Sequence, residues 1–459
     1  MGTLKDYPDE GEAVYESLEN MDISTADDED ENKILRLDTL PAEILLHILN
    51  YLDVKFIVDV LASVCIKFKD IANNDATWRI RISRRWPGQY PAIPLVNENC
   101  EIRQLTNSIT DVTFDNTDGH GQTIFTKQSA VFSWTEACIA REEETRIWTN
   151  PEVMMKAIVC SNAHYSSVDC VKIIKDLVIS GSRDRGINIW NIDDVKKGVS
   201  KPCLKLPDAH KGWVWSFSSK SGEVGGTDLV SGSWDNTVKF WSLSSSSLLE
   251  TRKPVNLKVA VLSTDMLENT VVAGTYDKKV VIMDAREEVK KMTFYRSHSK
   301  PVLGVKMTPR HILSLSEDQT LVVYDRVAGK RFKRVHIPGD SFPLSLSLSL
   351  NSLYVGDKSG SVHLIDTSYD RFDVIHSYTD TGHRTKITSV TGGLGSVITA
   401  SSAADVRIHQ PDRGLGLIKT ISNPDCGELA QISYDSTPGR QTLAAGFSNN
   451  TVKIWTRAD

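Results

Sequence analysis

Histidine, serine and aspartate residues recur together in the last two thirds of this 459-residue chain. The two most complete sets are His164, Ser180 and Asp184, and His210, Ser231 and Asp235. A histidine placed between a serine and an aspartate activates the serine as a nucleophile in many hydrolases. Catalysis needs such a set once, whereas these residue types return along the chain, with further histidines at His298 and His383. The recurrence favours a structural role over nucleophilic catalysis.

Other patterns that carry chemistry are absent from the sequence. There is no glycine-rich phosphate-binding loop, no G-x-S-x-G nucleophile elbow and no cysteine/histidine set with metal-ligand spacing. The seven cysteines include no C-x-x-C pair, which favours free thiols. We therefore expect a non-enzymatic protein without metal or cofactor, located in the cytoplasm, the nucleus or both.

The sequence around these residues repeats as well, and the repeat predicts the fold class. Each copy has an apolar strand, a Ser/Gly strand, a tight turn and a third strand that ends in Trp or a replacement. The copies end at Trp190, Trp241, Met283, Tyr324, Ile365, His409 and Trp455. A period near 40 residues is typical of propeller blades, each a four-stranded sheet that buries its faces against its neighbours. We predict a mainly β protein with a seven-bladed propeller over residues 151–459.

Two further segments of the repeat region predict strands. The chain ends soon after Trp455, so the seventh blade lacks an outer strand of its own. Residues 154–159 are apolar and precede His164, and we expect them to supply that strand and close the ring. Residues 344–350 alternate Leu and Ser without a break, which predicts a strand with one buried face.

Residues 34–86 have a helical rather than a repeating character. Pro41 and Glu43 suit a first helical turn, and Ile44, Leu45, Ile48, Leu49 and Leu52 follow at helical spacing. Apolar stretches over 56–64 and 68–72 predict two more short helices. Three short helices make a small core that leaves apolar surface for a partner.

The remaining segments have a biased or mixed composition. Residues 1–33 hold twelve acidic residues and two lysines, within a net charge of −6 for the whole chain, and we predict a disordered tail. Without this tail the chain is only mildly basic, which does not favour nucleic-acid binding. Residues 87–150 are predicted to be a linker, with a helix near 132–148 that orients one domain relative to the other and exposes Glu142–Glu144 to solvent. No apolar run is long enough to predict a membrane span.

The repeats resemble WD repeats. In that family the loop histidine, a strand serine, the turn aspartate and the terminal tryptophan form a buried hydrogen-bonded chain. The resemblance implies one such network of His164, Ser180, Asp184 and Trp190, and another of His210, Ser231, Asp235 and Trp241. It also implies that the residues just before the turns lie on one face, which often binds partners.

On that face the residues before the turns are Arg183, Trp234, Tyr276, Glu317, Lys358, Ser402 and Ser448. Trp, Tyr and Arg dominate the binding energy of many interfaces. Our substrate-binding candidates are Arg183, Trp213, Trp234, Tyr276 and Lys358. Phosphate recognition needs converging guanidinium groups, and the single arginine among the turn positions does not favour a phosphorylated ligand.

Residues 37–84 resemble an F-box. The resemblance is carried by the segment from Leu40-Pro41-x-Glu43 to Tyr51-Leu52, then by Val64-Cys65-x-x-Phe68, Ile71-Ala72 and Trp78. It implies binding to a Skp-type adaptor and, through it, to a cullin–RING ubiquitin ligase. The implied adaptor-binding residues are Leu40, Pro41, Ile44, Leu45, Ile48 and Leu52.

An F-box ahead of a WD-repeat array resembles the F-box/WD-repeat substrate receptors of SCF-type ubiquitin ligases. The expected function is to hold a protein substrate near the ubiquitin-conjugating machinery. The alternative is a WD-repeat interaction scaffold without a ligase role. Co-purification with the adaptor separates these two hypotheses.

Overall fold

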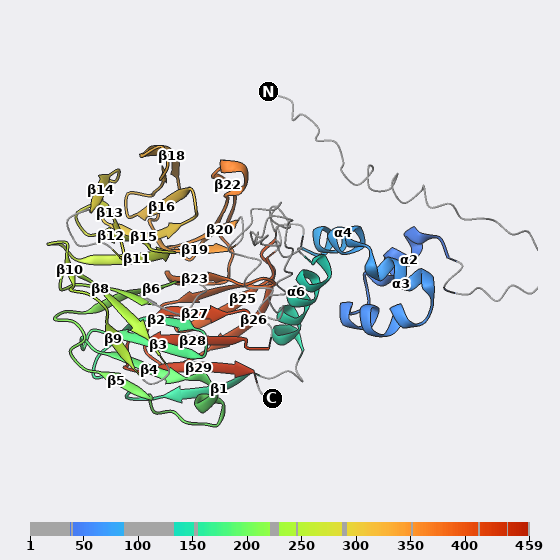
Figure 1. Cartoon of the computed structure of the whole chain (residues 1–459), viewed down its shortest axis with the longest axis horizontal. Coiled ribbons are helices and arrows are strands. Elements are labelled where there is room, and N and C mark those ends of the chain that lie inside the picture. Colours follow the sequence, from blue (N-terminus) through green and yellow to red (C-terminus); the bar gives the residue numbers. More distant parts are fainter. Residues whose placement is uncertain are drawn as a thin grey trace, which may run out of the picture. The chain divides into compact units, whose positions relative to one another are not determined.

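The computed structural model describes residues 37, 40–86, 133–150, 155–220, 229–244, 247–286, 292–349, 352–411, 414–437 and 439–457. They form two compact units, which we describe separately. The first contains the residues up to 85 together with 133–139, and the second contains residue 86 and the residues from 140 onward. Figure 1 shows the helices of the first and the strands of the second. The predicted acidic tail and most of the predicted linker lie outside the described residues.

The first unit has one more helix than the three predicted. Its helices are α2 (Ala42–Leu49), a π-helical turn η2 (Phe56–Val60) that continues into the 3-10 turn η3 (Leu61–Ser63), α3 (Ile66–Asn73) and α4 (Asp75–Arg85). The chain between α3 and α4 is extended at Asn74. The Asn74 side chain accepts a hydrogen bond from the Ala76 N–H at 2.9 Å. An asparagine in this role starts a new helix, so Trp78 lies within α4 rather than at the end of the third helix.

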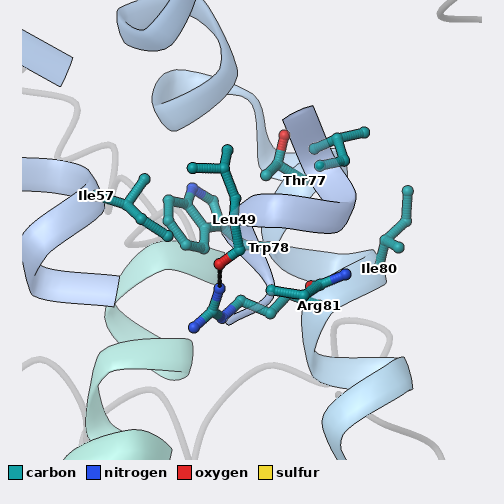
Figure 2. Close-up of a pocket in the computed structure, with 8 residues that line it drawn as sticks. Leu49, Ile57, Thr77, Trp78, Ile80 and Arg81 are labelled. Carbon is teal, nitrogen blue, oxygen red and sulfur yellow. Dashed lines mark hydrogen bonds between the residues drawn. The ribbon is translucent and has the colours of Figure 1, made fainter. Parts of the chain in front are cut away.

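The core of the first unit joins α2 to α4. Leu49, Ile57 and Trp78 are each at most 4% exposed, and the Trp78 indole N–H donates to the Ala72 carbonyl at 2.8 Å. Arg81 donates to the Leu49 and Leu52 carbonyls, which satisfies backbone acceptors left free at the end of α2. The cavity among these side chains measures about 10 Å³, room for one water molecule (Figure 2). The described part of this unit therefore offers a partner its surface and not an internal pocket.

The second unit is a ring of seven sheets, as predicted. Blade 1 contains β2 (Val168–Ile174), β3 (Leu177–Ser182), β4 (Ile187–Asn191) and β5 (Leu204–Leu206), with the short helix α7 (Ile192–Lys196) after β4. Blade 2 contains β6 (Val214–Ser219), β7 (Leu229–Ser233), β8 (Thr237–Leu243), β9 (Leu248–Glu250) and β10 (Val255–Asn256). Blade 3 contains β11 (Val261–Leu267), β12 (Thr270–Thr275), β13 (Lys279–Asp284) and β14 (Thr293–Arg296).

The later blades have the same antiparallel order. Blade 4 contains β15 (Val302–Met307), β16 (His311–Ser316), β17 (Thr320–Asp325) and β18 (Lys330–His336). Blade 5 contains β19 (Pro343–Ser349), β20 (Ser352–Asp357), β21 (Val362–Asp366) and β22 (Asp373–Tyr378), with the 3-10 turn η5 (Ser368–Asp370) between the last two. Blade 6 contains β23 (Ile387–Gly392), β24 (Val397–Ser401), β25 (Asp405–His409) and β26 (Leu417–Ser422). Blade 7 contains β27 (Leu429–Asp435), β28 (Thr442–Phe447), β29 (Val452–Arg457) and β1 (Met155–Cys160).

The predicted closure of the ring is confirmed. Strand β1 pairs antiparallel with β29, so that Met155 lies opposite Arg457 and Cys160 lies opposite Val452. The predicted strand over 344–350 is β19, but its leucines are only half-buried. The reason is that β19 is the innermost strand of its blade and lines the central cavity of the ring.

Neighbouring blades approach closely at the glycine of the Ser/Gly strand. A Cβ atom on Gly181 would lie 2.6 Å from Val214 Cγ1 of the next blade, and one on Gly232 would lie 2.6 Å from Val261 Cγ1. Real Cβ atoms do not approach other atoms so closely. The Ser/Gly signature therefore has a packing cause: the glycine admits the first residue of the next innermost strand.

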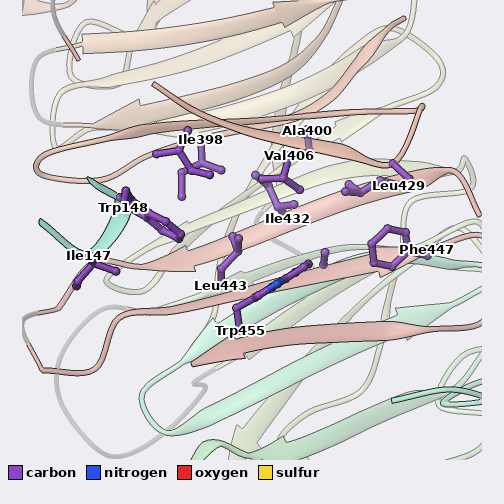
Figure 3. Packing of buried hydrophobic residues seen from close by; sticks show 13 residues of the cluster. Ile147, Trp148, Ile398, Ala400, Val406, Leu429, Ile432, Leu443, Phe447 and Trp455 are labelled. Carbon is purple, nitrogen blue, oxygen red and sulfur yellow. The ribbon is translucent and has the colours of Figure 1, made fainter. Parts of the chain in front are cut away.

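Helix α6 (Trp134–Thr149) forms where a helix near 132–148 is predicted. Its residues from Ala140 onward belong to the second unit. There Ile147 and Trp148 join a cluster with Ile398, Leu443 and Trp455 (Figure 3). The predicted solvent exposure of Glu144 is wrong, because Glu144 is fully buried. Its carboxylate accepts hydrogen bonds from the backbone N–H groups of Leu394 and Gly395, both at 2.8 Å, and from the Ser396 hydroxyl.

Candidate protein-binding surfaces

The residues predicted to bind the adaptor differ in how accessible they are. Pro41 and Ile44 are exposed, Ile44 to 48%. Leu40, Ile48 and Leu52 are half-buried. Leu45 is only 1% exposed and belongs to the core of the first unit. The structure thus separates Leu45, which packs in the core, from Pro41 and Ile44, which are accessible at the surface.

Several exposed apolar side chains of the same unit were not among the predicted residues. They are Tyr51, Phe56, Val60, Val64 and Ile66. These residues lie on the turns that follow α2 and at the start of α3. Exposed apolar side chains in such a number indicate a protein-binding surface. The sequence signal was available, since Phe56, Val60 and Val64 stand at helical spacing.

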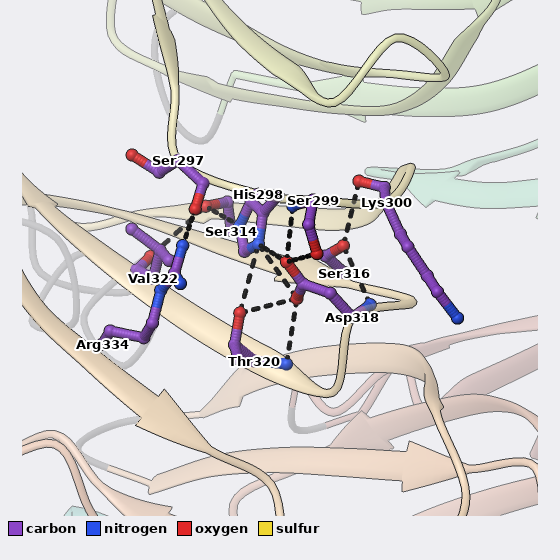
Figure 4. Close-up of polar contacts among 10 residues, drawn as sticks. All are labelled: Ser297, His298, Ser299, Lys300, Ser314, Ser316, Asp318, Thr320, Val322 and Arg334. Carbon is purple, nitrogen blue, oxygen red and sulfur yellow. Dashed lines mark hydrogen bonds and ion pairs between the residues drawn. The ribbon is translucent and has the colours of Figure 1, made fainter.

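The predicted hydrogen-bonded set of blade 2 is complete. His210 contacts Asp235 through Nδ1 at 2.9 Å and Ser231 Oγ through Nε2 at 2.7 Å. The Trp241 indole N–H donates to the same Ser231 oxygen at 2.8 Å. A third set, His298, Ser314 and Asp318, has the same geometry in blade 4 (Figure 4). Three copies of one arrangement indicate a repeated structural element.

Blade 1 departs from the prediction at one residue. His164 contacts Asp184 at 2.9 Å and Ser180 at 2.7 Å, as expected. The Trp190 indole N–H instead donates to the Ser200 carbonyl at 3.1 Å. Helix α7 lengthens the connection between β4 and β5, and Ser200 lies in that connection. The longer connection supplies Trp190 with an acceptor that blade 2 does not have.

The burial of these sets excludes the catalytic alternative. Ser180, Ser231 and Ser314 are all fully buried, so no substrate carbonyl can reach their hydroxyl groups. Burial raises the pKa of Asp184, but hydrogen bonds from His164 and from two backbone N–H groups outweigh it and lower that pKa to about 2. The aspartates therefore stay ionised and hold the histidines in one orientation.

The seven residues before the turns occupy equivalent places, as predicted. In each blade the backbone N–H of this residue donates to the carbonyl of the residue just before the innermost strand. Examples are Trp234 to the Trp213 carbonyl at 3.0 Å and Lys358 to the Phe342 carbonyl at 3.1 Å. The residue two positions later has a positive φ in every blade: Arg185, Asn236, Lys278, Gln319, Gly360, Ala404 and Asn450. Blades 5 to 7 keep this turn although they lack the aspartate, so the turn geometry alone sets the face.

Four aromatic residues of this face form one group, which we call the aromatic cluster: Trp213, Trp215, Trp234 and Tyr276. The Trp213 and Trp234 ring centroids are 5.5 Å apart, and those of Trp234 and Tyr276 are 6.1 Å apart. Three of these residues were predicted, and Trp215 was missed. The sequence could have indicated Trp215, because it stands two residues after Trp213, in the innermost strand of blade 2.

Arg183 lies against the cluster and is already paired with a carboxylate. Its guanidinium carbon is 4.8 Å from the Trp213 ring centroid. The same guanidinium donates to the Asp169 carboxylate through Nε at 2.9 Å and through Nη2 at 3.2 Å. Lys358 lies apart from the cluster, over the Phe342 ring at 5.0 Å. The predicted candidates are therefore one group of four residues and one separate lysine.

The innermost strands also enclose a central cavity of about 860 Å³, lined by both polar and apolar residues. Among the described residues, no group of three His, Cys, Asp or Glu side chains could hold a metal ion. No helix in the described part of the chain is long and apolar enough to cross a membrane. The cysteines that the structure describes are free thiols.

Comparison with known proteins assigns the class of this chain. Residues 37–84 match the F-box-like family, and residues 201–242 match the WD domain, G-beta repeat family. The molecule therefore combines an F-box with a WD-repeat propeller.

Full-length relatives with this architecture identify the family. F-box/WD repeat-containing protein 9 of Homo sapiens is 32% identical over 81% of this chain and 73% of its own length, and the Bos taurus protein is 31% identical over the same shares. F-box/WD repeat-containing protein mec-15 of Caenorhabditis elegans is 24% identical over 91% of this chain and 95% of its own length. The chain belongs to the F-box/WD-repeat protein family.

Proposed function

We propose that this chain is the substrate-recognition subunit of an SCF-type ubiquitin ligase. Its F-box binds a Skp-type adaptor, and its propeller binds the protein to be ubiquitinated. The chain contributes no catalytic residue and raises the reaction rate by holding the substrate near the conjugating enzyme.

One observation supports this proposal: a single chain has exposed apolar residues both on its helical unit and on the turn face of its propeller. The exposed apolar residues of the F-box, such as Ile44, lie on a helical unit. The aromatic cluster lies on the turn face of a closed ring. Apolar surfaces on two different units fit a receptor that joins two proteins.

Binding of the purified chain to a purified Skp-type adaptor tests the proposal. The substitutions Pro41→Ala and Ile44→Glu change exposed residues, so they should abolish binding and leave the melting temperature unchanged. Val327→Glu is the matched control, because Val327 is an apolar propeller residue that is 85% exposed. A wild-type chain that does not bind the adaptor would favour the scaffold hypothesis, and a double variant that still binds would move the adaptor surface away from α2.

A further inference from the structure

The aromatic cluster presents a continuous apolar surface across blades 2 and 3. Trp213 is 40% exposed, Trp234 is 37% exposed and Tyr276 is 55% exposed. Their rings contact one another in sequence, from Trp213 through Trp234 to Tyr276. Large aromatic side chains at this exposure lose much of their contact with water when a partner covers them, which makes them strong anchors.

Three carboxylates of blades 1 to 3 are already paired. Asp208 accepts from Arg185 at 2.8 Å, and Asp277 pairs with Lys279. Asp169 is held by Arg183. None of these three carboxylates is left to attract a cationic ligand.

Three exposed lysines beside the cluster have no such partner. Lys211, Lys258 and Lys278 each lack a carboxylate within ion-pair distance among the described residues. Backbone hydrogen bonds fix their places: the Lys211 N–H donates to Asp235, and the Lys278 N–H donates to Thr275. Lys258 follows Leu257, whose N–H donates to the Asn236 carbonyl in the turn of blade 2. The rim of the cluster is therefore positive.

The cations on this rim are lysine ammonium groups, and they suit carboxylates better than phosphate groups. A phosphate group is bound best by guanidinium forks that converge on it. The Arg183 guanidinium, which lies over the Trp213 ring, is already paired with Asp169. Separate ammonium groups on different loops suit single carboxylates spread along a peptide.

We propose that the aromatic cluster binds an extended, unphosphorylated peptide in which an aromatic or proline anchor is flanked by acidic residues. The anchor covers Trp234 and Tyr276, and the flanking carboxylates reach Lys211, Lys258 and Lys278. This inference rests on the proposed function, since the peptide would be the recognised segment of the substrate.

A library of nine-residue synthetic peptides tests the proposal. The central residue is Phe, Trp, Pro or Ala, and the flanking residues are all Glu, all Lys, all Ser or all phosphoserine. Binding to the full chain is measured by fluorescence anisotropy. Peptides with Glu flanks and an aromatic or proline centre should bind at least tenfold more tightly than peptides with Lys flanks or an Ala centre. The affinity of these Glu-flanked peptides should fall as the salt concentration rises.

Substitutions locate the site and provide the controls. Trp234→Ala, and separately Lys211→Glu with Lys278→Glu, should each weaken the Glu-flanked peptides at least tenfold. Lys330→Glu with Arg331→Glu, which reverses two exposed charges on β18, should leave binding unchanged. Three results would overturn the proposal. They are tightest binding by the phosphoserine peptides, equal affinity for Lys-flanked and Glu-flanked peptides, and no binding to any peptide. Adaptor binding is measured on the same samples, so the proposed function fails only if that binding is lost in the wild-type chain.

Discussion

At the scale of single residues, hydrogen-bonded side chains hold the loops of the propeller to its strands. His210 connects the loop before blade 2 to a strand serine and a turn aspartate. A buried polar group without its partner costs free energy, so each member depends on the others. This dependence explains why the residues recur together and why they resemble a catalytic set.

Asp235→Ala tests the structural role of this set. The substitution leaves the His210 ring and the Lys211 N–H without their acceptor, and we expect a loss of about 3 kcal/mol in the free energy of unfolding. Asp340→Ala, at an exposed aspartate, is the control and should change the stability by less than about 0.5 kcal/mol. Chemical denaturation measures both, and equal stability of the two variants would contradict the structural role.

The sequence predicted most of these contacts but not all of them. The resemblance to WD repeats implied the sets of blades 1 and 2, in which serine and aspartate stand four residues apart. The partner of the Trp190 indole depends instead on the path of the β4–β5 connection, and no residue pattern encodes that path. The same limit applies to Glu144, which stands in a charged helical stretch. Nothing in that stretch predicts that the β23–β24 hairpin will supply its carboxylate with hydrogen-bond donors.

At the scale of elements, helix α6 is joined to blade 6 through a buried carboxylate. Burial raises the pKa of Glu144 to about 7, although hydrogen bonds from Ser396, Gly395 and Leu394 and the charge of Arg141 oppose this rise. The folded chain therefore binds a proton at this site at a higher pH than the unfolded chain does. The contribution of Glu144 to stability is greatest below its unfolded pKa and is lost as pH rises toward 7.

Glu144→Gln should remove this pH dependence. A neutral amide can still accept the backbone hydrogen bonds, and it carries no charge to desolvate. Between pH 5 and pH 7 the wild-type chain should lose stability on the order of 2 kcal/mol from this group, and the variant should lose much less. Thermal melts across this range compare the two proteins, with Glu142→Gln as the control on the same helix. Parallel pH profiles for wild type and Glu144→Gln would show that the carboxylate does not titrate in this window.

Ring closure is the second property that belongs to this scale. Strand β1 covers the edge of β29, and an uncovered edge strand promotes aggregation. Deletion of residues 153–160 should therefore give a chain that aggregates or melts far below the wild type. A soluble deletion variant with an unchanged melting temperature, shown by light scattering and calorimetry, would contradict the role of β1 in closure.

At the scale of the whole molecule, the sequence was sufficient for the fold class and insufficient for the binding surface. The repeat period predicted seven blades, since each blade must bury its faces against its neighbours. The aromatic cluster brings together residues from separate blades, Trp213 and Trp234 with Tyr276, and only the closed ring makes them neighbours. The pairing of Arg183 with Asp169 likewise needs the geometry, and it adds to the sequence argument against a phosphorylated ligand.

The central claim is that one chain binds an adaptor and a substrate through two independent surfaces. Quantitative mass spectrometry of proteins co-purified from cells tests it with three chains: wild type, Pro41→Ala with Ile44→Glu, and Trp234→Ala with Lys211→Glu. We expect the F-box variant to lose the adaptor and cullin while keeping the substrates, and the cluster variant to keep the adaptor while losing a set of substrates. Joint loss of adaptor and substrates in folded variants, or no change in either, would contradict the claim.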